Sequence, residues 1–126
     1  MSLPPPIPTI EVTEADRRLR ERPGAPDAPI LLDVREANEF AAVRAPGAVL
    51  VPTSVFTARL AELPPDRPLL VVCHVGGRSA AVTAYLLRTG RTDVVNVAGG
   101  MDAWERAGLP VRRGPLEPGE GDLPAG

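Results

Sequence analysis

A cysteine, two adjacent glycines and an arginine lie close together in residues 73–79. The apolar run at residues 69–72 precedes them, and a helix is expected from about Gly77 to Thr89. A turn that contains Gly76 and Gly77 can fold its backbone N–H groups around a small anion. Together with the partial positive charge of the helix N-terminus, these groups favour a thiolate at Cys73 and lower its pKa. The pattern therefore predicts a nucleophilic cysteine.

Two further side chains of this segment could take part in the chemistry. Arg78 adds a permanent cation in the first turn of the helix, and we expect it to bind an oxyanion beside the sulfur. His74 could move protons or bind an entering anion, or it could simply face solvent. The alternative for Cys73 is a structural cysteine that ends a core strand, since free cysteine is among the most buried residue types. The glycine pair and the arginine favour a functional role.

The composition excludes several other classes of function. The chain has 126 residues, the length of about one domain, and its 44% apolar and 24% charged residues are typical of globular proteins. A net charge of −2 argues against binding to nucleic acid. The chain has no lysine, which excludes Schiff-base chemistry. With one cysteine and one histidine, an internal disulfide and a histidine-pair metal site are also excluded, so we expect no metal and no cofactor.

The sequence also gives expectations about the location of the protein. We find no basic and apolar leader at the N-terminus and no run of about 18 apolar residues that could span a membrane. We therefore expect a cytoplasmic protein without a membrane partner, an environment that suits a free thiol. The lack of lysine, with abundant alanine, arginine and proline, suggests a GC-rich bacterial genome.

Short apolar runs alternate with helix-length segments along the chain, separated by proline and glycine. This alternation predicts an α/β domain of three layers, with a central five-stranded, mostly parallel sheet flanked by helices. The strands are expected at residues 10–12, 30–32, 49–51, 69–72 and 94–97, and the helices at 13–22, 37–43, 53–63, 77–89 and 101–107. The run at residues 69–72 does not alternate with polar residues and should lie in the middle of the sheet.

The domain is expected to cover residues 9–113. Residues 1–8 form a proline-rich lead, and residues 114–126 are expected to be a mobile tail, because proline, glycine and glutamate dominate there without periodicity. In parallel sheets, ligands bind where the strands end at their carboxyl side. Three such ends carry residues that could bind a ligand: Asp33, Cys73 and Ala98-Gly99-Gly100.

Three ordered motifs resemble the rhodanese-like domain family of sulfurtransferases, and the likeness runs from about residue 10 to residue 111. They are Leu32-Asp33-Val34-Arg35-Glu36 with Glu39-Phe40 and Pro46-Gly47-Ala48; the loop from Cys73 to Ser79; and Asn96-Val97-Ala98-Gly99-Gly100-Met101 with Ala103-Trp104 and Gly108-Leu109-Pro110-Val111. Their order and separations make the match specific.

The resemblance implies a thiosulfate sulfurtransferase-like enzyme. Cys73 would take a sulfane sulfur from thiosulfate or a related donor, hold it as a persulfide, and pass it to cyanide, a thiol or a protein acceptor. The substrate-binding residues implied are those of the loop: His74, Val75, Gly76, Gly77, Arg78 and Ser79. Asp33 and Arg35 match the family's Asp-x-Arg segment and are expected to support the site, paired with each other, with Glu39 or with the loop. A plain surface ion pair is the alternative for them.

This chain departs from the usual family pattern at two positions. Val43-Arg44-Ala45 stands where members usually have Gly-His-Ile, which leaves the conformation of that loop open. His74 stands where arginine or lysine is common, so fewer fixed cations face an anionic donor.

Two alternatives to a sulfurtransferase enzyme remain. One is a persulfide carrier or sulfur-sensing module, which loads Cys73 but turns over thiosulfate poorly. The other is a cysteine phosphatase or arsenate reductase, whose loop has one more residue between cysteine and arginine than the four between Cys73 and Arg78. The shorter loop here favours a single sulfur atom over a tetrahedral phosphate.

Overall fold

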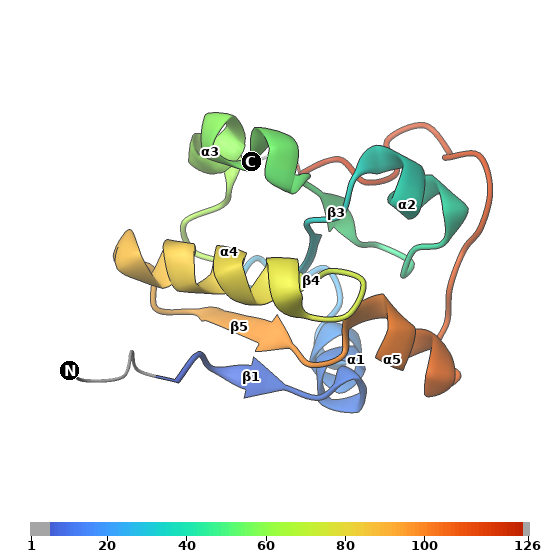
Figure 1. Cartoon of the computed structure of the whole chain (residues 1–126), viewed down its shortest axis with the longest axis horizontal. Coiled ribbons are helices and arrows are strands. Elements are labelled where there is room, and N and C mark those ends of the chain that lie inside the picture. The colour runs from blue at the N-terminus through green and yellow to red at the C-terminus, as the bar shows by residue number, and fades with distance from the viewer. Residues whose placement is uncertain (1–5, 125–126) are drawn as a thin grey trace.

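The computed structural model describes residues 6–124, which form one parallel sheet of five strands in the order β1-β5-β4-β2-β3 (Figure 1). The strands are β1 (Thr9–Ile10), β2 (Ile30–Asp33), β3 (Val49–Leu50), β4 (Leu69–Val72) and β5 (Val94–Val97). The predicted α/β fold is confirmed, and β4 lies in the middle of the sheet as expected.

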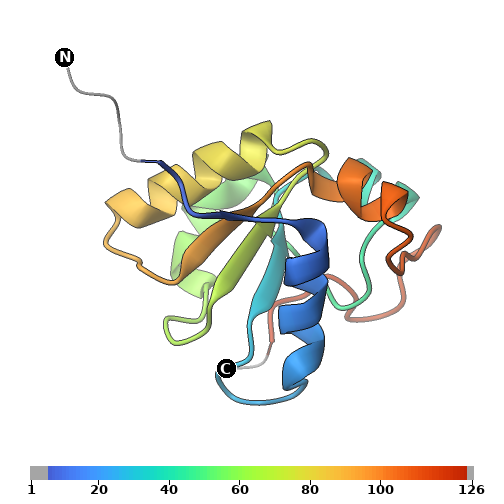
Figure 2. The same ribbon diagram turned by 90° about the horizontal axis from the view of Figure 1, so that it is seen from below.

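Helices cover both faces of this sheet. They are α1 (Val12–Glu21), α2 (Ala37–Ala42), α3 (Phe56–Arg59), α4 (Gly77–Arg88) and α5 (Gly100–Arg106), with the 3-10 turns η1 (Thr53–Val55) and η2 (Leu60–Glu62) on either side of α3. Figure 2 shows α3 and α4 on one side of the sheet and α1 and α5 on the other. The three layers expected from the sequence are therefore present.

The continuous helix expected at residues 53–63 is wrong, because the structure divides this segment into η1, α3 and η2. The backbone leaves helical geometry at Val55, with φ −126° and ψ 12°, and again at Arg59, with φ −105° and ψ 5°. Thr53, Ser54 and Val55 are weak helix formers, so the beginning of the segment has little intrinsic tendency to form an α-helix.

The core consists of two apolar layers, one on each face of the sheet. Strand β4 contributes to both, since Leu69 and Val71 pack under α3 and α4 whereas Leu70 and Val72 pack toward α1 and α5. All four side chains are buried. Burial on both faces is the reason why this strand has no alternation of apolar and polar residues.

The strand register brings the expected functional residues to one edge of the sheet. Asp33, the last residue of β2, lies beside Val72, the last residue of β4, and Val71 lies beside Asn96 of β5. Cys73 follows β4 directly, so it lies between the segments that follow β2 and β5.

The C-terminal segment, residues 112–124, packs along the domain. Arg44 and Arg112 exchange two backbone hydrogen bonds, and Leu50 of the edge strand β3 donates its N–H to the carbonyl of Gly121 at 2.8 Å. The side chain of Leu123 packs against the apolar layer under α3 and α4. The composition did not predict these contacts. Mobility of the tail in solution stays a prediction, and residues 125–126 lie outside the described residues.

The Arg44 side chain holds this C-terminal segment in place. It is only 1% exposed and donates hydrogen bonds to the carbonyl of Gly114 at 2.8 Å and to the Glu120 carboxylate at 3.0 Å. Its guanidinium also lies over the ring of Phe40. The departure Val43-Arg44-Ala45 thus places a buried arginine where it binds the chain's own C-terminal segment.

Candidate active site

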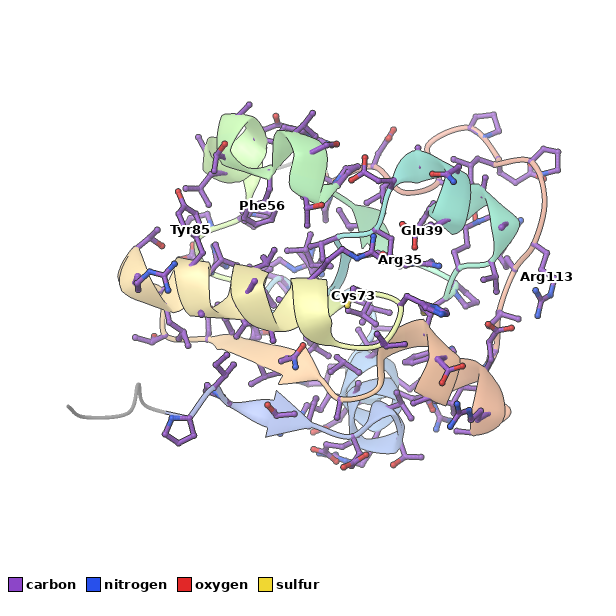
Figure 3. The ribbon with its side chains drawn as sticks, viewed as in Figure 1. Arg35, Glu39, Phe56, Cys73, Tyr85 and Arg113 are labelled. Atoms are coloured by element: carbon purple, nitrogen blue, oxygen red, sulfur yellow. The ribbon has the colours of Figure 1, made fainter. Side chains whose placement is uncertain are left out.

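Cys73 lies at the centre of the site, between the end of β4 and the beginning of α4 (Figure 3). Its side chain is 1% exposed, and its Sγ accepts a hydrogen bond from the backbone N–H of Gly76 at 3.0 Å. The Oγ of Ser79 lies 3.2 Å from the same sulfur. Gly76 adopts φ 116°, a conformation that side chains other than glycine rarely take, and this turns the chain back over the sulfur.

Helix α5 fixes the outer side of the loop. The N–H of Met101 donates to the carbonyl of Cys73 at 2.8 Å, and the N–H of Asp102 donates to the carbonyl of His74 at 3.0 Å. The first turn of α5 therefore binds the loop carbonyls, which leaves loop N–H groups free to face the sulfur. Gly100 makes this approach possible, because a Cβ there would lie 2.3 Å from the Cys73 carbonyl oxygen.

These surroundings set the ionisation of the thiol. Burial opposes the thiolate, but the hydroxyl of Ser79 and the backbone N–H groups of Ser79, Gly76 and Val75 outweigh it and lower the pKa of Cys73. The N-terminus of α4 adds its partial positive charge at the same place. The nest of N–H groups expected from the glycine pair is thus present around the sulfur.

Ser79 is buried and lies between the sulfur and a backbone carbonyl. Its Oγ is 3.2 Å from Cys73 Sγ and also 3.2 Å from the carbonyl oxygen of Gly76. The hydroxyl has one proton, so it can donate either to the carbonyl or to a thiolate. When Cys73 is a thiol, the S–H can donate to Ser79 Oγ, and when Cys73 ionises, the hydroxyl can turn to the sulfur.

The guanidinium of Arg78 makes a two-pronged ion pair with Glu39 of α2. Its Nη1 and Nη2 atoms lie 2.7 and 2.8 Å from the two carboxylate oxygens. The hydrogen bonds and charge of Glu39 raise the pKa of Arg78, and the hydrogen bonds from Arg78 lower the pKa of Glu39 to about 2. Binding of an anionic donor by Arg78 stays a prediction, and such a donor would meet this pair rather than an isolated cation.

Asp33 and Arg35 form a second ion pair behind the site. They are 0% and 2% exposed, and Arg35 Nη2 lies 2.8 Å from Asp33 Oδ2. Arg35 also donates to the carbonyls of Glu39, within α2, and of Val43, which follows the helix directly. The alternative of a surface ion pair is wrong. The pair holds α2, and therefore Glu39, in position.

The tip of the loop faces outward. His74 and Gly77 are exposed, and the side chain of Val75 is 62% exposed. The sulfur of Cys73 is therefore buried beneath loop residues that face solvent, and we call His74, Val75 and Gly77 the exposed rim of the loop. None of the described residues brings three metal-ligating side chains together.

The sequence did not identify Glu39 as the partner of Arg78, although it named Glu39 as one possible partner of Arg35. The two residues are far apart in the chain, and the pairing of β2 with β4 brings them together, because α2 follows β2 and α4 follows β4 at the same edge of the sheet. A local signal exists for Glu39 as a capping residue, because Glu36 and Glu39 form a capping box at the start of α2. That signal concerns the helix and not the loop.

The fold and the cysteine loop define a parallel α/β domain that stabilises a thiolate at the end of a central strand. Residues 12–107 match the family model described as "Rhodanese-like domain". The chain therefore belongs to the rhodanese-like domain family, as the three sequence motifs indicated.

Its relatives carry sulfurtransferase names. A protein of Allochromatium vinosum named "Sulfurtransferase" is 38% identical over 82 residues, which are 65% of this chain and 77% of the relative. A protein of Actinobacillus succinogenes named "Thiosulfate sulfurtransferase GlpE" is 37% identical over 82 residues, 65% of this chain and 74% of the relative.

Solved structures show the same fold. A rhodanese-related protein from Thermoplasma volcanium is 28% identical with a TM-score of 0.74, over 83% of this chain and 97% of that one. A thiosulfate sulfurtransferase from Pseudomonas aeruginosa is 27% identical with a TM-score of 0.75, over 87% of this chain but only 21% of that one. Within the described part of this chain, no helix is long and apolar enough to span a membrane.

Proposed function

We propose that this protein is a sulfurtransferase that carries a sulfane sulfur as a persulfide on Cys73. The observation that carries the proposal is the surroundings of the sulfur, where the Gly76 N–H at 3.0 Å and the Ser79 hydroxyl at 3.2 Å stabilise a negative charge. The names of the relatives support the same activity.

The first half of the reaction uses the thiolate as nucleophile. The Cys73 sulfur attacks the outer sulfur of thiosulfate, a new S–S bond forms, and the bond to the sulfonate breaks with its electron pair, so that sulfite leaves. The product is a Cys73 persulfide anion. The loop N–H groups that lower the pKa of the thiol can stabilise the charge of the persulfide in the same way.

The second half of the reaction requires an external acceptor. Cys73 is the only cysteine of the chain, so no second thiol of the same chain can release the sulfur as a disulfide. Cyanide or a thiol attacks the terminal sulfur and restores the Cys73 thiolate. The exposed rim at His74 and Val75 is the side from which such an acceptor can approach. A reducing compartment such as the cytoplasm suits this free thiol.

Intact-mass measurement tests the proposal directly. The purified protein is incubated with thiosulfate, and we expect a gain of one sulfur atom that is absent in Cys73→Ala. Addition of cyanide should remove the sulfur and release thiocyanate. No gain with several sulfane donors, or a gain that persists in Cys73→Ala, would contradict the proposal.

A persulfide carrier is the second candidate, because the sole cysteine supports loading without any means of internal release. The two candidates share the first half-reaction. Multiple turnover with cyanide or a small thiol supports the enzyme, whereas stoichiometric loading without turnover supports the carrier. Cys73-dependent hydrolysis of an aryl phosphate would instead favour a phosphatase, which the short loop disfavours.

A further inference from the structure

Glu39 binds both terminal nitrogens of the Arg78 guanidinium, and Arg78 is the only arginine in residues 73–79. Arg78 Nη1 and Nη2 each donate to a different oxygen of its carboxylate, at 2.7 and 2.8 Å. The two side chains are 38% and 30% exposed, so the pair lies at the edge of the site and not in the core. Figure 3 shows Glu39 on the side of α2 that faces the loop carrying Cys73.

The same side of the site holds a second cation, and a carboxylate neutralises it as well. Arg35 is buried against Asp33 at 2.8 Å. Glu36, at the start of α2, adds a further carboxylate, which accepts hydrogen bonds from Ser54 and Thr53 and has no guanidinium partner among the ion pairs of the described residues. Asp33 and Glu39 therefore neutralise Arg35 and Arg78, and Glu36 adds a further negative charge at the start of α2. The stabilisation of negative charge at the sulfur comes from backbone N–H groups and the Ser79 hydroxyl rather than from charged side chains.

Charge then distinguishes the possible donors. Thiosulfate is a dianion, and the sulfite that leaves is also a dianion. The reacting group of an organic persulfide or an organic thiosulfonate carries at most one negative charge and releases a thiol, a thiolate or a sulfinate. A site whose side-chain cations are all neutralised gains less from the second charge of thiosulfate, and Glu39 repels it.

We propose that Glu39 is a specificity-determining residue, which neutralises Arg78 and so favours sulfane donors with a single negative charge over thiosulfate. The proposal rests on the proposed function, since it concerns the same transfer to Cys73. The step is Cys73 thiolate plus the methanethiosulfonate anion giving Cys73 persulfide anion plus methanesulfinate anion, so that one S–S bond forms and one S–S bond breaks with the same total charge.

Two donors that differ in charge test the proposal. Methanethiosulfonate anion has a methyl group where thiosulfate has one charged oxygen. The two donors therefore have similar shapes, and in both the bond that breaks is an S–S bond. The rate of sulfur addition to Cys73 is measured by intact mass in a single turnover with each donor, for the unchanged protein and for Glu39→Gln. Glutamine keeps an oxygen that can accept the N–H of Glu36, a bond that Glu39 makes at 3.0 Å.

We expect Glu39→Gln to raise the rate with thiosulfate about three- to tenfold and to raise the rate with methanethiosulfonate less, so that the ratio of the two rates changes. Glu105→Gln is the matched control. Its carboxylate is 34% exposed and pairs with Arg113 at 2.6 Å, and Figure 3 shows Arg113 far from Cys73. The control makes the same change in net charge and should leave the ratio unchanged.

Three results would overturn the proposal. An unchanged ratio in Glu39→Gln means that its charge does not select donors. Slower loading with thiosulfate means that Glu39 serves to hold Arg78 in place for the donor. A change of ratio that persists when Glu39→Gln is made together with Arg78→Ala means that Glu39 does not act through Arg78. Loading of the unchanged protein by neither donor contradicts the proposed function itself, and this result is separate from the other three.

Discussion

The hydroxyl oxygen of Ser79 lies 3.2 Å from the sulfur of Cys73, and both side chains are buried. Ser79 is the only side chain in hydrogen-bond contact with the sulfur within the described residues, since the other donor is the backbone N–H of Gly76. The serine hydroxyl therefore stabilises a thiolate in a way that a single substitution can remove.

Ser79→Ala should raise the pKa of Cys73, because the thiolate loses a hydrogen bond while its burial is unchanged. A hydrogen bond to a charged group is worth about 1.5–3 kcal/mol, so alkylation by iodoacetamide at neutral pH should be about tenfold slower or more. The measurement is the pH dependence of the alkylation rate. In the unchanged protein, the alkylation rate should reach its maximum at a pH below the range in which an ordinary free thiol ionises. In Ser79→Ala, the rate should reach its maximum only at a higher pH.

Thr83→Val is the control for this substitution. The hydroxyl of Thr83 lies one turn further along α4 and donates to the carbonyl of Ser79 at 2.8 Å, without contact to the sulfur. The control should keep the alkylation profile of the unchanged protein. Equal profiles for all three proteins would mean that Ser79 does not affect the ionisation of Cys73.

Gly100→Ala should destabilise the domain and disturb the cysteine loop. The added Cβ would lie 2.3 Å from the carbonyl oxygen of Cys73 and 2.6 Å from that of His74, so the loop and α5 must move apart. Gly108→Ala, at the other end of α5, has a similar positive φ of 72° but no atom within 4 Å of the added Cβ.

The comparison between these two glycines separates crowding from backbone strain. The positive φ alone should cost about 1–2 kcal/mol in both variants, and crowding should add about 1–3 kcal/mol in Gly100→Ala only. Denaturant unfolding measures the free energies, and loading of Cys73 by a sulfane donor measures the loop. Normal loading in Gly100→Ala would show that α5 does not fix the loop.

Asp33→Asn should leave Arg35 as a buried cation without a counter-charge. Removal of one partner from a buried ion pair costs about 3–5 kcal/mol of the free energy of unfolding. Because Arg35 also binds the carbonyls around α2, we expect weaker positioning of Glu39 as well. Asp27→Asn, in the exposed pair with Arg22, is the control and should change the stability little. An equal effect of both substitutions would argue against a supporting role for Asp33.

Arg44→Met should release the C-terminal segment and lower the free energy of unfolding by about 3–5 kcal/mol, since Arg44 is buried and holds both Gly114 and Glu120. Limited proteolysis should then cleave residues 114–124 in the variant before the rest of the domain. Arg113→Met, which removes an exposed arginine of the same segment, should have little effect. Equal proteolysis of all three proteins would support the mobile tail that the composition suggests.

The contribution of the Arg44–Glu120 ion pair to the stability of the protein should depend on pH. The hydrogen bonds from Arg44 lower the pKa of Glu120 to about 2, from an ordinary value of 4.5 in the unfolded chain. A carboxyl whose pKa is lower in the folded state stabilises the protein above its unfolded pKa, and this stabilisation disappears as the pH falls. The difference in stability between the unchanged protein and Glu120→Gln should therefore be constant above about pH 5 and shrink between pH 4.5 and 2. A difference that does not change over this range would contradict the pairing.

The sequence was sufficient for the parts of this fold that depend on local pattern. The run at β4 has no alternation because both faces of that strand are buried, and the turn beside Cys73 needs Gly76, which has φ 116°. Gly77 has no positive φ and open space around it, so the turn does not require a glycine there. The contacts that the sequence did not reveal join distant segments. Glu39 meets Arg78 because β2 pairs with β4, and residues 114–124, which have no periodic pattern, are bound by the buried Arg44 side chain from another part of the chain.

Helix α5 contains Trp104, the only tryptophan of the chain, which is buried and donates its indole N–H to the carbonyl of Pro110 at 2.8 Å. The same helix begins at the residues whose N–H groups bind the carbonyls of Cys73 and His74. Any rearrangement of the loop that moves α5 also changes the surroundings of the indole. The protein therefore has a built-in fluorophore whose emission reports movement of α5 without an attached dye.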